Sequence, residues 1–177
     1  MIIKSTIETP LGNMTAGATE EGLCLLAFSD EKLPGSGFED IAGLLKTTIK
    51  EGENIHLRKA GKELKEYFDG SRKVFSVPLI LTGPPFQQNV WKELLNIPYG
   101  TTRSYSEQAA ALGIPEAVRA VAGANGRNRI AIIVPCHRVI GSDGRLTGYG
   151  GGIKRKEWLL DHEKRHSGQP FNITLFT

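Results

Sequence analysis

The cluster Thr82-Gly83-Pro84-Pro85 divides the sequence into two parts with different periodicities. A glycine followed by two prolines interrupts both helices and strands, because proline lacks the backbone N–H that either structure uses. Before the cluster, polar and apolar residues alternate as in strands, and after it the spacing is mostly helical. A chain of 177 residues is long enough for two small domains. We therefore expect an N-terminal domain over residues 1–83, a C-terminal domain over residues 84–164 and a polar tail over residues 165–177.

The N-terminal part predicts a small α/β scaffold. Residues 2–8, 12–18 and 22–28 have strand patterns separated by turn residues, which favours an antiparallel meander. The spacing of apolar residues then predicts two helices, and a last strand follows them. They are expected over residues 38–49, 56–68 and 74–81.

The C-terminal part predicts mostly helices. Residues 104–112 form a short Ala-rich helix, Gly113 and Ile114 turn the chain, and Pro115 suits the first position of a helix over residues 116–124. This arrangement is a helix-turn-helix. Further helices are expected over residues 86–95 and 154–164, and a buried strand over residues 130–134.

The two parts also differ in charge. Residues 1–83 carry two more acidic than basic side chains, whereas residues 84–177 carry five more basic than acidic ones. A basic domain suits a polyanion such as nucleic acid, although charged residues often only solvate a surface. The first ten residues lack the apolar core of a signal peptide, and no apolar run approaches the roughly 20 residues that span a bilayer. We expect a soluble, cytoplasmic protein.

Cys136 is the candidate nucleophile. It follows the apolar run in Pro135-Cys136-His137-Arg138, and a thiol becomes strongly nucleophilic where a neighbouring cation or dipole favours the thiolate. Successive side chains of a strand point to opposite faces, so His137 can assist only if the chain turns there or a water bridges the two. The alternative is a small buried hydrophobic residue. We adopt that alternative for Cys24, which has no ionisable neighbour.

Neither a disulfide nor a metal site is expected. An intracellular setting keeps thiols reduced, and the surroundings of Cys24 and Cys136 differ. The two cysteines and four histidines show no spacing typical of zinc ligands.

The string Pro135-Cys136-His137-Arg138-Val139 resembles the O6-alkylguanine-DNA alkyltransferases, especially their stand-alone bacterial members. The likeness covers most of residues 84–163, and residues 1–83 resemble the family's ribonuclease-H-like domain loosely, through the order of their elements. The other matching segments are SYSEQAAAL with Tyr105, AVRAVAGAN with Arg119, NGRNRI with Asn128, TGYGGG with Tyr149 and KEWLLDHE with Glu163. The resemblance implies an α/β (α+β) fold. A small ribonuclease-H-like domain precedes a mostly helical domain with a helix-turn-helix and an active-site cysteine turn.

The resemblance also implies an activity. In this family the acceptor cysteine takes the alkyl group of an O6-alkylguanine irreversibly, so each molecule acts once. Cys136 corresponds to the acceptor, His137 to the base that reaches it through water, Glu163 to the acid that orients His137, and Asn128 to the hinge of the cysteine turn. No cofactor is implied, O4-alkylthymine is a further substrate, and the protein is expected to act as a monomer without an obligate protein partner.

The implied partner is double-stranded DNA, bound in the minor groove with the damaged nucleotide flipped out of the stack. Arg119 corresponds to the finger that replaces the flipped base, Tyr105 to the residue that crowds its 3′ phosphate, and Tyr149 to a donor to guanine. Gly150 belongs to a loop that lies over the base. Contacts to the DNA backbone are implied more weakly for Gln87, Ser106 and Ser142.

Two positions depart from the mammalian-type pattern, and two other functions remain open. Ala131 stands where those relatives carry a proline, and Gly150 replaces a serine, which leaves the accepted adduct size undetermined. One alternative is a Cys-His hydrolase with an acyl-enzyme, which predicts turnover and leaves Arg119 unused. The other is a module that binds damaged DNA without repairing it, although such proteins lack the acceptor cysteine that Cys136 provides.

Overall fold

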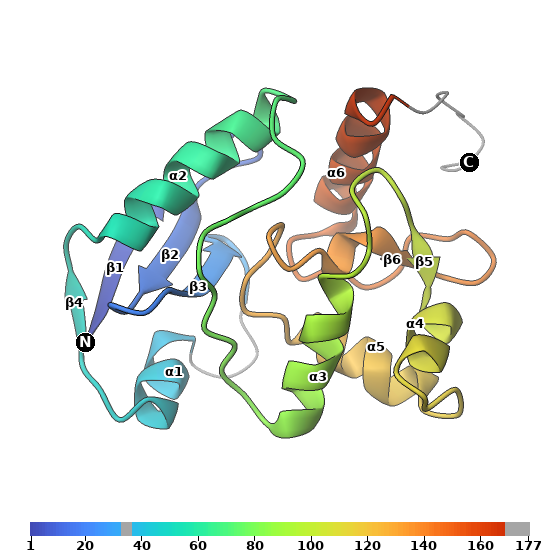
Figure 1. Ribbon diagram of the computed structural model, residues 1–177, viewed down its shortest axis with the longest axis horizontal. Coiled ribbons are helices and arrows are strands. Elements are labelled where there is room, and N and C mark those ends of the chain that lie inside the picture. Colours follow the sequence, from blue (N-terminus) through green and yellow to red (C-terminus); the bar gives the residue numbers. More distant parts are fainter. Residues whose placement is uncertain (33–36, 169–177) are drawn as a thin grey trace. The chain divides into compact units, whose positions relative to one another are not determined.

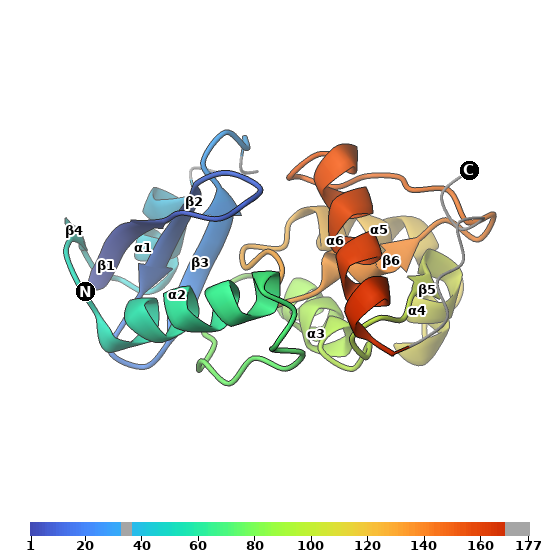
Figure 2. The same cartoon turned by 90° about the horizontal axis from the view of Figure 1, so that it is seen from above.

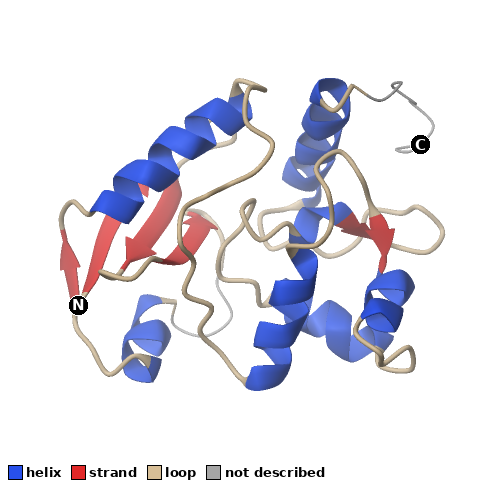
Figure 3. Ribbon diagram, in the orientation of Figure 1, coloured by secondary structure: helices blue, strands red, loops and turns tan. Residues whose placement is uncertain are grey.

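The computed structural model describes residues 1–32 and 37–168, which fall into two compact units. The first unit contains Met1–Pro84 and the short segment Arg129–Ala131, and the second contains Pro85–Asn128 and the chain from Ile132 onward. Figure 3 shows that the longer strands belong to the first unit and that the second is mostly helical. The α/β fold class expected from the sequence is confirmed.

The first unit is built on a mixed sheet with the strand order β3-β2-β1-β4. The strands are β1 (Ile2–Ile7), β2 (Met14–Ala18), β3 (Leu23–Phe28) and β4 (Ile49–Glu51). The first three form the predicted antiparallel meander, and β4 pairs parallel to β1. Helices α1 (Phe38–Leu44) and α2 (Ile55–Phe68) lie on different sides of this sheet (Figures 1 and 2). Every residue of β3 is accordingly buried.

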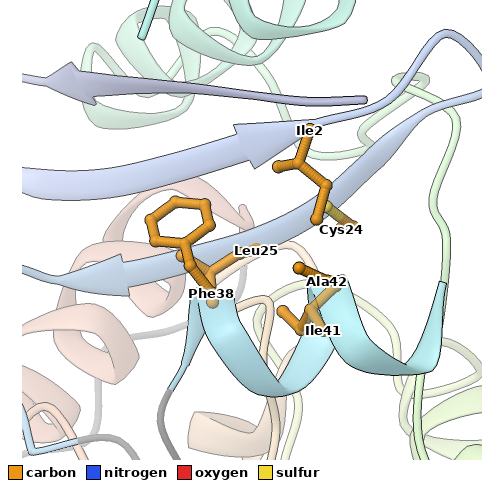
Figure 4. Close-up of a cluster of buried hydrophobic side chains, with 6 residues drawn as sticks. All are labelled: Ile2, Cys24, Leu25, Phe38, Ile41 and Ala42. Carbon is orange, nitrogen blue, oxygen red and sulfur yellow. The ribbon is translucent and has the colours of Figure 1, made fainter. Parts of the chain in front are cut away.

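Helix α1 closes one part of the core through apolar side chains that meet the sheet. This cluster is drawn in Figure 4 and consists of Ile2, Cys24, Leu25, Phe38, Ile41 and Ala42. Cys24 donates its thiol to the carbonyl of Gly17 at 3.4 Å, and burial raises its pKa to about 11. It is an inert core residue, as predicted.

The outer edge of β3 pairs with two segments that are distant in the sequence. Leu23 exchanges backbone hydrogen bonds with Pro78 and Ile80, each at 2.8 Å, and Leu26 does the same with Arg129 and Ala131, also at 2.8 Å. These bonds satisfy backbone groups that an open edge strand would present for aggregation.

The helix predicted over residues 38–49 is wrong beyond Leu44. Lys46 has a left-handed φ of 50°, and the N–H of Thr47 bonds back to the carbonyl of Ala42 at 2.9 Å, which ends the helix. Thr47, Thr48 and Ile49 are β-branched and favour an extended chain, so β4 follows.

The strand predicted over residues 74–81 is also wrong, because only Leu79 forms a bridge, with Leu23. Pro78 has no N–H for a ladder, and the buried carboxylate of Glu63 accepts the N–H groups of Ser76 and Val77 at 2.9 and 3.2 Å. A side chain thus takes the donors that a neighbouring strand would otherwise use.

The second unit contains four α-helices among its described residues. They are α3 (Pro85–Leu94), α4 (Tyr105–Ala111), α5 (Val118–Gly126) and α6 (Ile153–His166). Strands β5 (Arg103–Ser104) and β6 (Val139–Ile140) form a short parallel pair. Ser104 begins α4 with a capping box to Glu107, and Gly113, with a φ of 75°, turns the chain toward α5. Helices α4 and α5 are the predicted helix-turn-helix.

Both ends of α5 (Val118–Gly126) and the end of α6 lie two residues later than the sequence predicted. Helix α5 begins at Val118, not near Pro115, because residues 114–117 form a turn closed by Ala117 N–H and the carbonyl of Ile114 at 2.9 Å. Helix α6 continues to His166, so the predicted tail begins inside a helix. The rest of that tail, residues 169–177, lies outside the described residues.

The buried strand predicted over residues 130–134 is a turn. Only Ile130 forms a bridge, with Leu26, and Ile132 has a left-handed φ of 71° that is unusual for a β-branched residue. Ile132 is nonetheless fully buried. The run is apolar because the turn is buried, and a buried turn and a buried strand have the same apolar pattern.

Candidate active site

Cys136 begins a single turn of 3-10 helix, η1 (Cys136–Arg138). The turn is closed by a hydrogen bond from the N–H of Arg138 to the carbonyl of Pro135, 3.0 Å long. Cys136 is half-buried, whereas His137 is completely buried. The chain therefore turns at the cysteine, which is the condition under which the sequence allowed His137 to assist it.

Asn128 links the end of α5 to this turn. Its side-chain amide nitrogen lies 2.8 Å from the carbonyl oxygen of Val134 and 3.2 Å from Sγ of Cys136. An amide donor aimed at sulfur favours the thiolate, because the charged form is the better acceptor. The structure thus brings Asn128 and Cys136 together, as the resemblance implied.

His137, Glu163 and Arg138 form a buried polar cluster. Nε2 of His137 lies 2.7 Å from Oε1 of Glu163, and Arg138 donates to both carboxylate oxygens at 2.9 Å. The N–H of Gly100 also approaches Oε2 at 3.3 Å. Burial disfavours the Glu163 carboxylate, but the charges and hydrogen bonds of His137 and Arg138 outweigh burial and hold its pKa well below the usual range. Glu163 is therefore ionised.

Arg138 serves this carboxylate and not the cysteine. Arg138 also donates to the carbonyl of Ile97 at 2.7 Å, and its guanidinium carbon lies 5.7 Å from the centre of the Tyr99 ring. Because Arg138 already balances Glu163, the imidazole of His137 does not need to be charged, and burial lowers its pKa. Nδ1 of His137 is buried and forms no hydrogen bond with any residue that the structure describes. With Nε2 donating to Glu163, Nδ1 is the acceptor of the neutral ring.

Lys156 is the site residue that the sequence analysis missed. This lysine of α6 is completely buried, and its ammonium donates to the carbonyl of Thr147 at 2.9 Å. It also lies 5.7 Å from the centre of the Tyr105 ring. Burial lowers its pKa to about 8, and the negative charge of Cys136 acts in the opposite direction. A cation thus interacts with the Cys136 sulfur without belonging to the motif around it.

A signal for Lys156 was present in the sequence. The buried residues of α6 include Lys156, Leu159, Leu160 and Glu163. These positions follow the i, i+3, i+4, i+7 spacing of one helix face. A lysine in phase with two leucines and a buried glutamate indicates a buried charge. Lys156 was nonetheless not among the residues predicted for the site.

A hollow of about 460 Å³ lies beside the helix-turn-helix. Its lining residues are Tyr105, Val118, Arg119, Ala122, Gly126, Thr147, Gly148, Tyr149 and Gly150. Tyr105 connects the hollow to the cysteine. Burial raises the pKa of Tyr105, its hydrogen bond to the carbonyl of Thr147 at 2.9 Å lowers it, and the charge of Cys136 raises it. Four of the residues predicted to bind DNA or the base therefore meet at one hollow.

The other predicted contact residues lie outside this hollow. The hydroxyls of Ser106 and Ser142 are 3.3 Å apart at an exposed position, and Gln87 is half-buried on α3. The expectation that the histidines lack a spacing typical of zinc ligands is wrong, since His162 and His166 stand four residues apart on α6. Among residues 1–32 and 37–168, however, no three potential ligands come together. No helix in the described part of the chain is long and apolar enough to cross a membrane.

The fold and site define a class of protein: a helix-turn-helix unit with a half-buried cysteine that accepts from an amide, and with a hollow lined by two tyrosines and an arginine. Residues 85–165 match the DNA-binding domain of 6-O-methylguanine DNA methyltransferase, and residues 2–81 match the ribonuclease-like domain of the same proteins. The chain belongs to the 6-O-methylguanine DNA methyltransferase family.

Individual relatives agree over nearly the whole chain. The methylated-DNA–protein-cysteine methyltransferase of Mycolicibacterium paratuberculosis is 44% identical over 176 residues, 99% of either chain. The constitutive enzyme of that name from Bacillus subtilis is 45% identical, over 90% of this chain and 94% of its own. The crystal structure of the Mycobacterium tuberculosis protein in complex with DNA is similar with a TM-score of 0.80 and 45% identity, over 98% of each chain.

Proposed function

We propose that this protein repairs DNA by transferring the alkyl group of an O6-alkylguanine to Sγ of Cys136. The observation that carries the proposal is the position of the cysteine. Its sulfur lies 3.2 Å from the Asn128 amide, next to a buried His137–Glu163 pair, and interacts with Tyr105, which lines the neighbouring hollow.

The transfer is a direct displacement. The Cys136 thiolate attacks the alkyl carbon, so a carbon–sulfur bond forms while the carbon–O6 bond breaks. The electron pair of the broken bond stays with the guanine, which takes up one proton and becomes ordinary guanine. Tyr149, at the hollow, is the proposed donor to the departing base. The product on the protein is a thioether.

Four groups favour the thiolate before the transfer. Nδ1 of His137 accepts the thiol proton through a bridging water, and Glu163 holds the ring through Nε2. The Asn128 amide and the Lys156 ammonium then stabilise the negative sulfur. Arg138 keeps Glu163 ionised and so acts one step further from the sulfur.

DNA binding is assigned to the helix-turn-helix, with α5 entering the minor groove. O6 of a stacked guanine is inaccessible to the thiolate, so the nucleotide must leave the duplex at a cost of a few kcal/mol. Arg119, exposed on α5 and lining the hollow, is proposed to replace the extruded base and offset this cost. Tyr105 and Gly150 contact the flipped nucleotide, whereas Ser106, Ser142 and Gln87 contact the DNA backbone.

The reaction ends with the first transfer. A thioether is stable to water, so nothing regenerates the thiol. The displacement itself needs no cofactor. Neither cysteine forms a disulfide, and a reduced acceptor suits the cytoplasm, where we place the protein.

The test is intact-protein mass after incubation with an oligonucleotide duplex that contains one O6-methylguanine. We expect one added methyl group per molecule, on Cys136, with no further turnover. C24A is the matched control and should react normally, whereas C136A should bind the duplex without gaining mass. Multiple turnover would instead favour a Cys-His hydrolase, and binding of wild type without a mass change would favour a damage-sensing module.

A further inference from the structure

Two amide side chains form a closed hydrogen-bonded pair between the helices of the helix-turn-helix. Nε2 of Gln108 on α4 donates to Oδ1 of Asn125 at 2.9 Å, and Nδ2 of Asn125 on α5 donates to Oε1 of Gln108 at 2.6 Å. Gln108 is completely buried, and Asn125 is 5% exposed. Each amide is therefore donor and acceptor to the other, away from water.

The buried cluster beside the pair consists of small side chains, and the partly buried Leu112, Ile114 and Val118 pack against it. Its buried members are Val90, Ala109, Val121 and Ala124. Alanine and valine side chains interlock weakly, because an alanine projects only one methyl group into the facing groove. Apolar contacts of this kind change little in energy if one helix rotates or slides against the other. Directional hydrogen bonds do not tolerate such a movement.

A second polar contact holds α5 on its other side. The indole nitrogen of Trp91 on α3 donates to the carbonyl of Ala124 at 2.8 Å. That contact is to the backbone, so it limits how far α5 moves but does not depend on which side chain faces α4. The Gln108–Asn125 pair is thus the contact that specifies a side chain of α5.

We propose that the Gln108–Asn125 pair sets the rotation and register of α5 and thereby positions Arg119 for base flipping. This inference rests on the proposed function. Arg119 belongs to the same rigid helix, six residues before Asn125. A slip of one residue turns an α-helix by about 100° and moves it by about 1.5 Å, which would carry Arg119 away from the hollow. Gln108 and Asn125 are positioning residues, because neither lines that hollow.

Single and double replacements separate this role from a purely structural one. Q108L or N125L leaves one buried amide without its partner, which destabilises the fold. Q108L/N125L removes both amides and keeps the interface apolar, so much of the stability returns. The exchanged pair Q108N/N125Q keeps both amides and the total side-chain size. If the pair served stability alone, the double leucine variant would behave much like the wild type. If the pair positions Arg119, that variant should be stable but poor at base flipping, because placement requires the amides.

The measured quantity is the rate of transfer from a duplex lesion divided by the rate with free O6-benzylguanine base, together with urea unfolding. We expect Q108L/N125L to keep the free-base rate within about threefold but to lower the duplex-to-free ratio by at least about tenfold. The exchanged pair should restore the ratio to within about threefold of wild type. A wild-type ratio in the double leucine variant would overturn the proposal.

Two further results keep the test decisive. If the double leucine variant does not fold, Q108N is compared with Q108N/N125Q, since the shorter side chain breaks the pair and the exchange restores its reach. Recovery of the ratio on exchange supports the proposal, and no recovery overturns it. If the wild type reacts with neither substrate, the proposed function is contradicted. The duplex-to-free ratio of variants that do react tests only the role of the Gln108–Asn125 pair.

Discussion

Oε1 of Glu163 lies 2.7 Å from Nε2 of His137, and neither side chain has any exposed surface. Burial is the largest influence on His137 and lowers its pKa, Glu163 opposes this, and the charges of Arg138 and Lys156 add to the lowering. The imidazole is therefore a neutral ring inside a charged cluster. That state has consequences for stability as well as for catalysis.

We expect the free energy of unfolding to fall as the pH is lowered below about 6.5, where an unfolded histidine begins to bind a proton. Folded His137 takes up its proton only at lower pH, so in this window the unfolded state holds more protons and is favoured. The lowered pKa of Glu163 matters at lower pH. The ionised carboxylate stabilises the folded state above about pH 4.3, and this stabilisation is lost as the pH falls below that value. The free energy of unfolding of H137Q, measured in urea, should fall less than that of the wild type between about pH 6.5 and 5. H56Q, in the first unit, controls for the loss of a histidine, and identical slopes in H137Q and wild type would contradict the assignment.

Arg119 should matter for paired lesions and not for the chemical step. R119A is expected to slow repair of an O6-methylguanine duplex by about 10- to 100-fold, because the extruded state loses a stabilisation of about 1.4 to 3 kcal/mol. The rate with free O6-benzylguanine should stay within about twofold. R127A is the matched control: it removes another exposed arginine, just after α5, whose guanidinium bonds to the carbonyl of Gly123 at 3.3 Å. Equal slowing of both substrates in R119A would exclude a role in flipping.

Lys156 should affect both reactivity and alkaline stability. Its pKa of about 8 in the folded protein is below the value of about 10.4 for an unfolded lysine, so between these values the unfolded state binds more protons. The free energy of unfolding of the wild type, measured in urea, should therefore increase relative to that of K156M from about pH 8 to about pH 9.5. The raised pKa of Cys24 lowers stability above about pH 8.5, but it does so equally in both proteins.

The same variant tests the catalytic assignment. K156M should react more slowly than the wild type with free O6-benzylguanine, since the thiolate loses a buried cation. A wild-type free-base rate in K156M would contradict a role of Lys156 in stabilising the thiolate and reduce it to a packing residue. K154M, at an exposed position two residues earlier on α6, is the control.

Local sequence signals account for the helices of the second unit but not for its irregular segments. Ser104 and Glu107 mark the start of α4, and apolar residues at helical spacing indicate the rest. Residues 74–81 and 130–134 were misassigned because distant groups, Glu63 and Leu26, decide where their backbone hydrogen bonds go. An apolar pattern predicts burial and does not reveal such partners.

The site could be predicted where a motif carried it. Cys136 and His137 were named from the residues themselves, with the condition that the chain turn there, and Glu163 was named through the resemblance. Lys156 and the Gln108–Asn125 pair were missed because their polar side chains suggest solvent exposure. Their burial depends on which faces of α4, α5 and α6 turn inward.

Gly100 should be needed to place Glu163. Its φ of 77° is unfavourable for other residues, and an added Cβ would lie 2.4 Å from Cβ of Ser167. G100A should therefore lower stability by about 1 to 3 kcal/mol and slow transfer, because the end of α6 and its Glu163 must shift. S167G removes the clashing atom, so G100A/S167G should recover part of the loss and retain the backbone strain. Unfolding and transfer rates of the two single variants and the double variant measure this coupling.

Methylation of Cys136 should destabilise the protein. The new methyl group must enter the space around Sγ, where the Asn128 amide lies 3.2 Å away and also holds the carbonyl of Val134 at 2.8 Å. Overpacking by one methylene typically costs about 1 to 3 kcal/mol, and the thioether is in addition a poorer acceptor for Asn128 than the thiolate.

The expected result is a lower thermal midpoint and weaker DNA binding for the methylated protein, with a larger effect after benzylation unless Ala131 leaves room. N128A provides the control, since it has already lost the amide contact and should show a smaller difference between its unreacted and methylated forms. Thermal unfolding and DNA affinity of the three forms measure the effect. Unchanged values across all three would mean that the sulfur faces open space, and that Asn128 does not transmit the state of the cysteine to the end of α5.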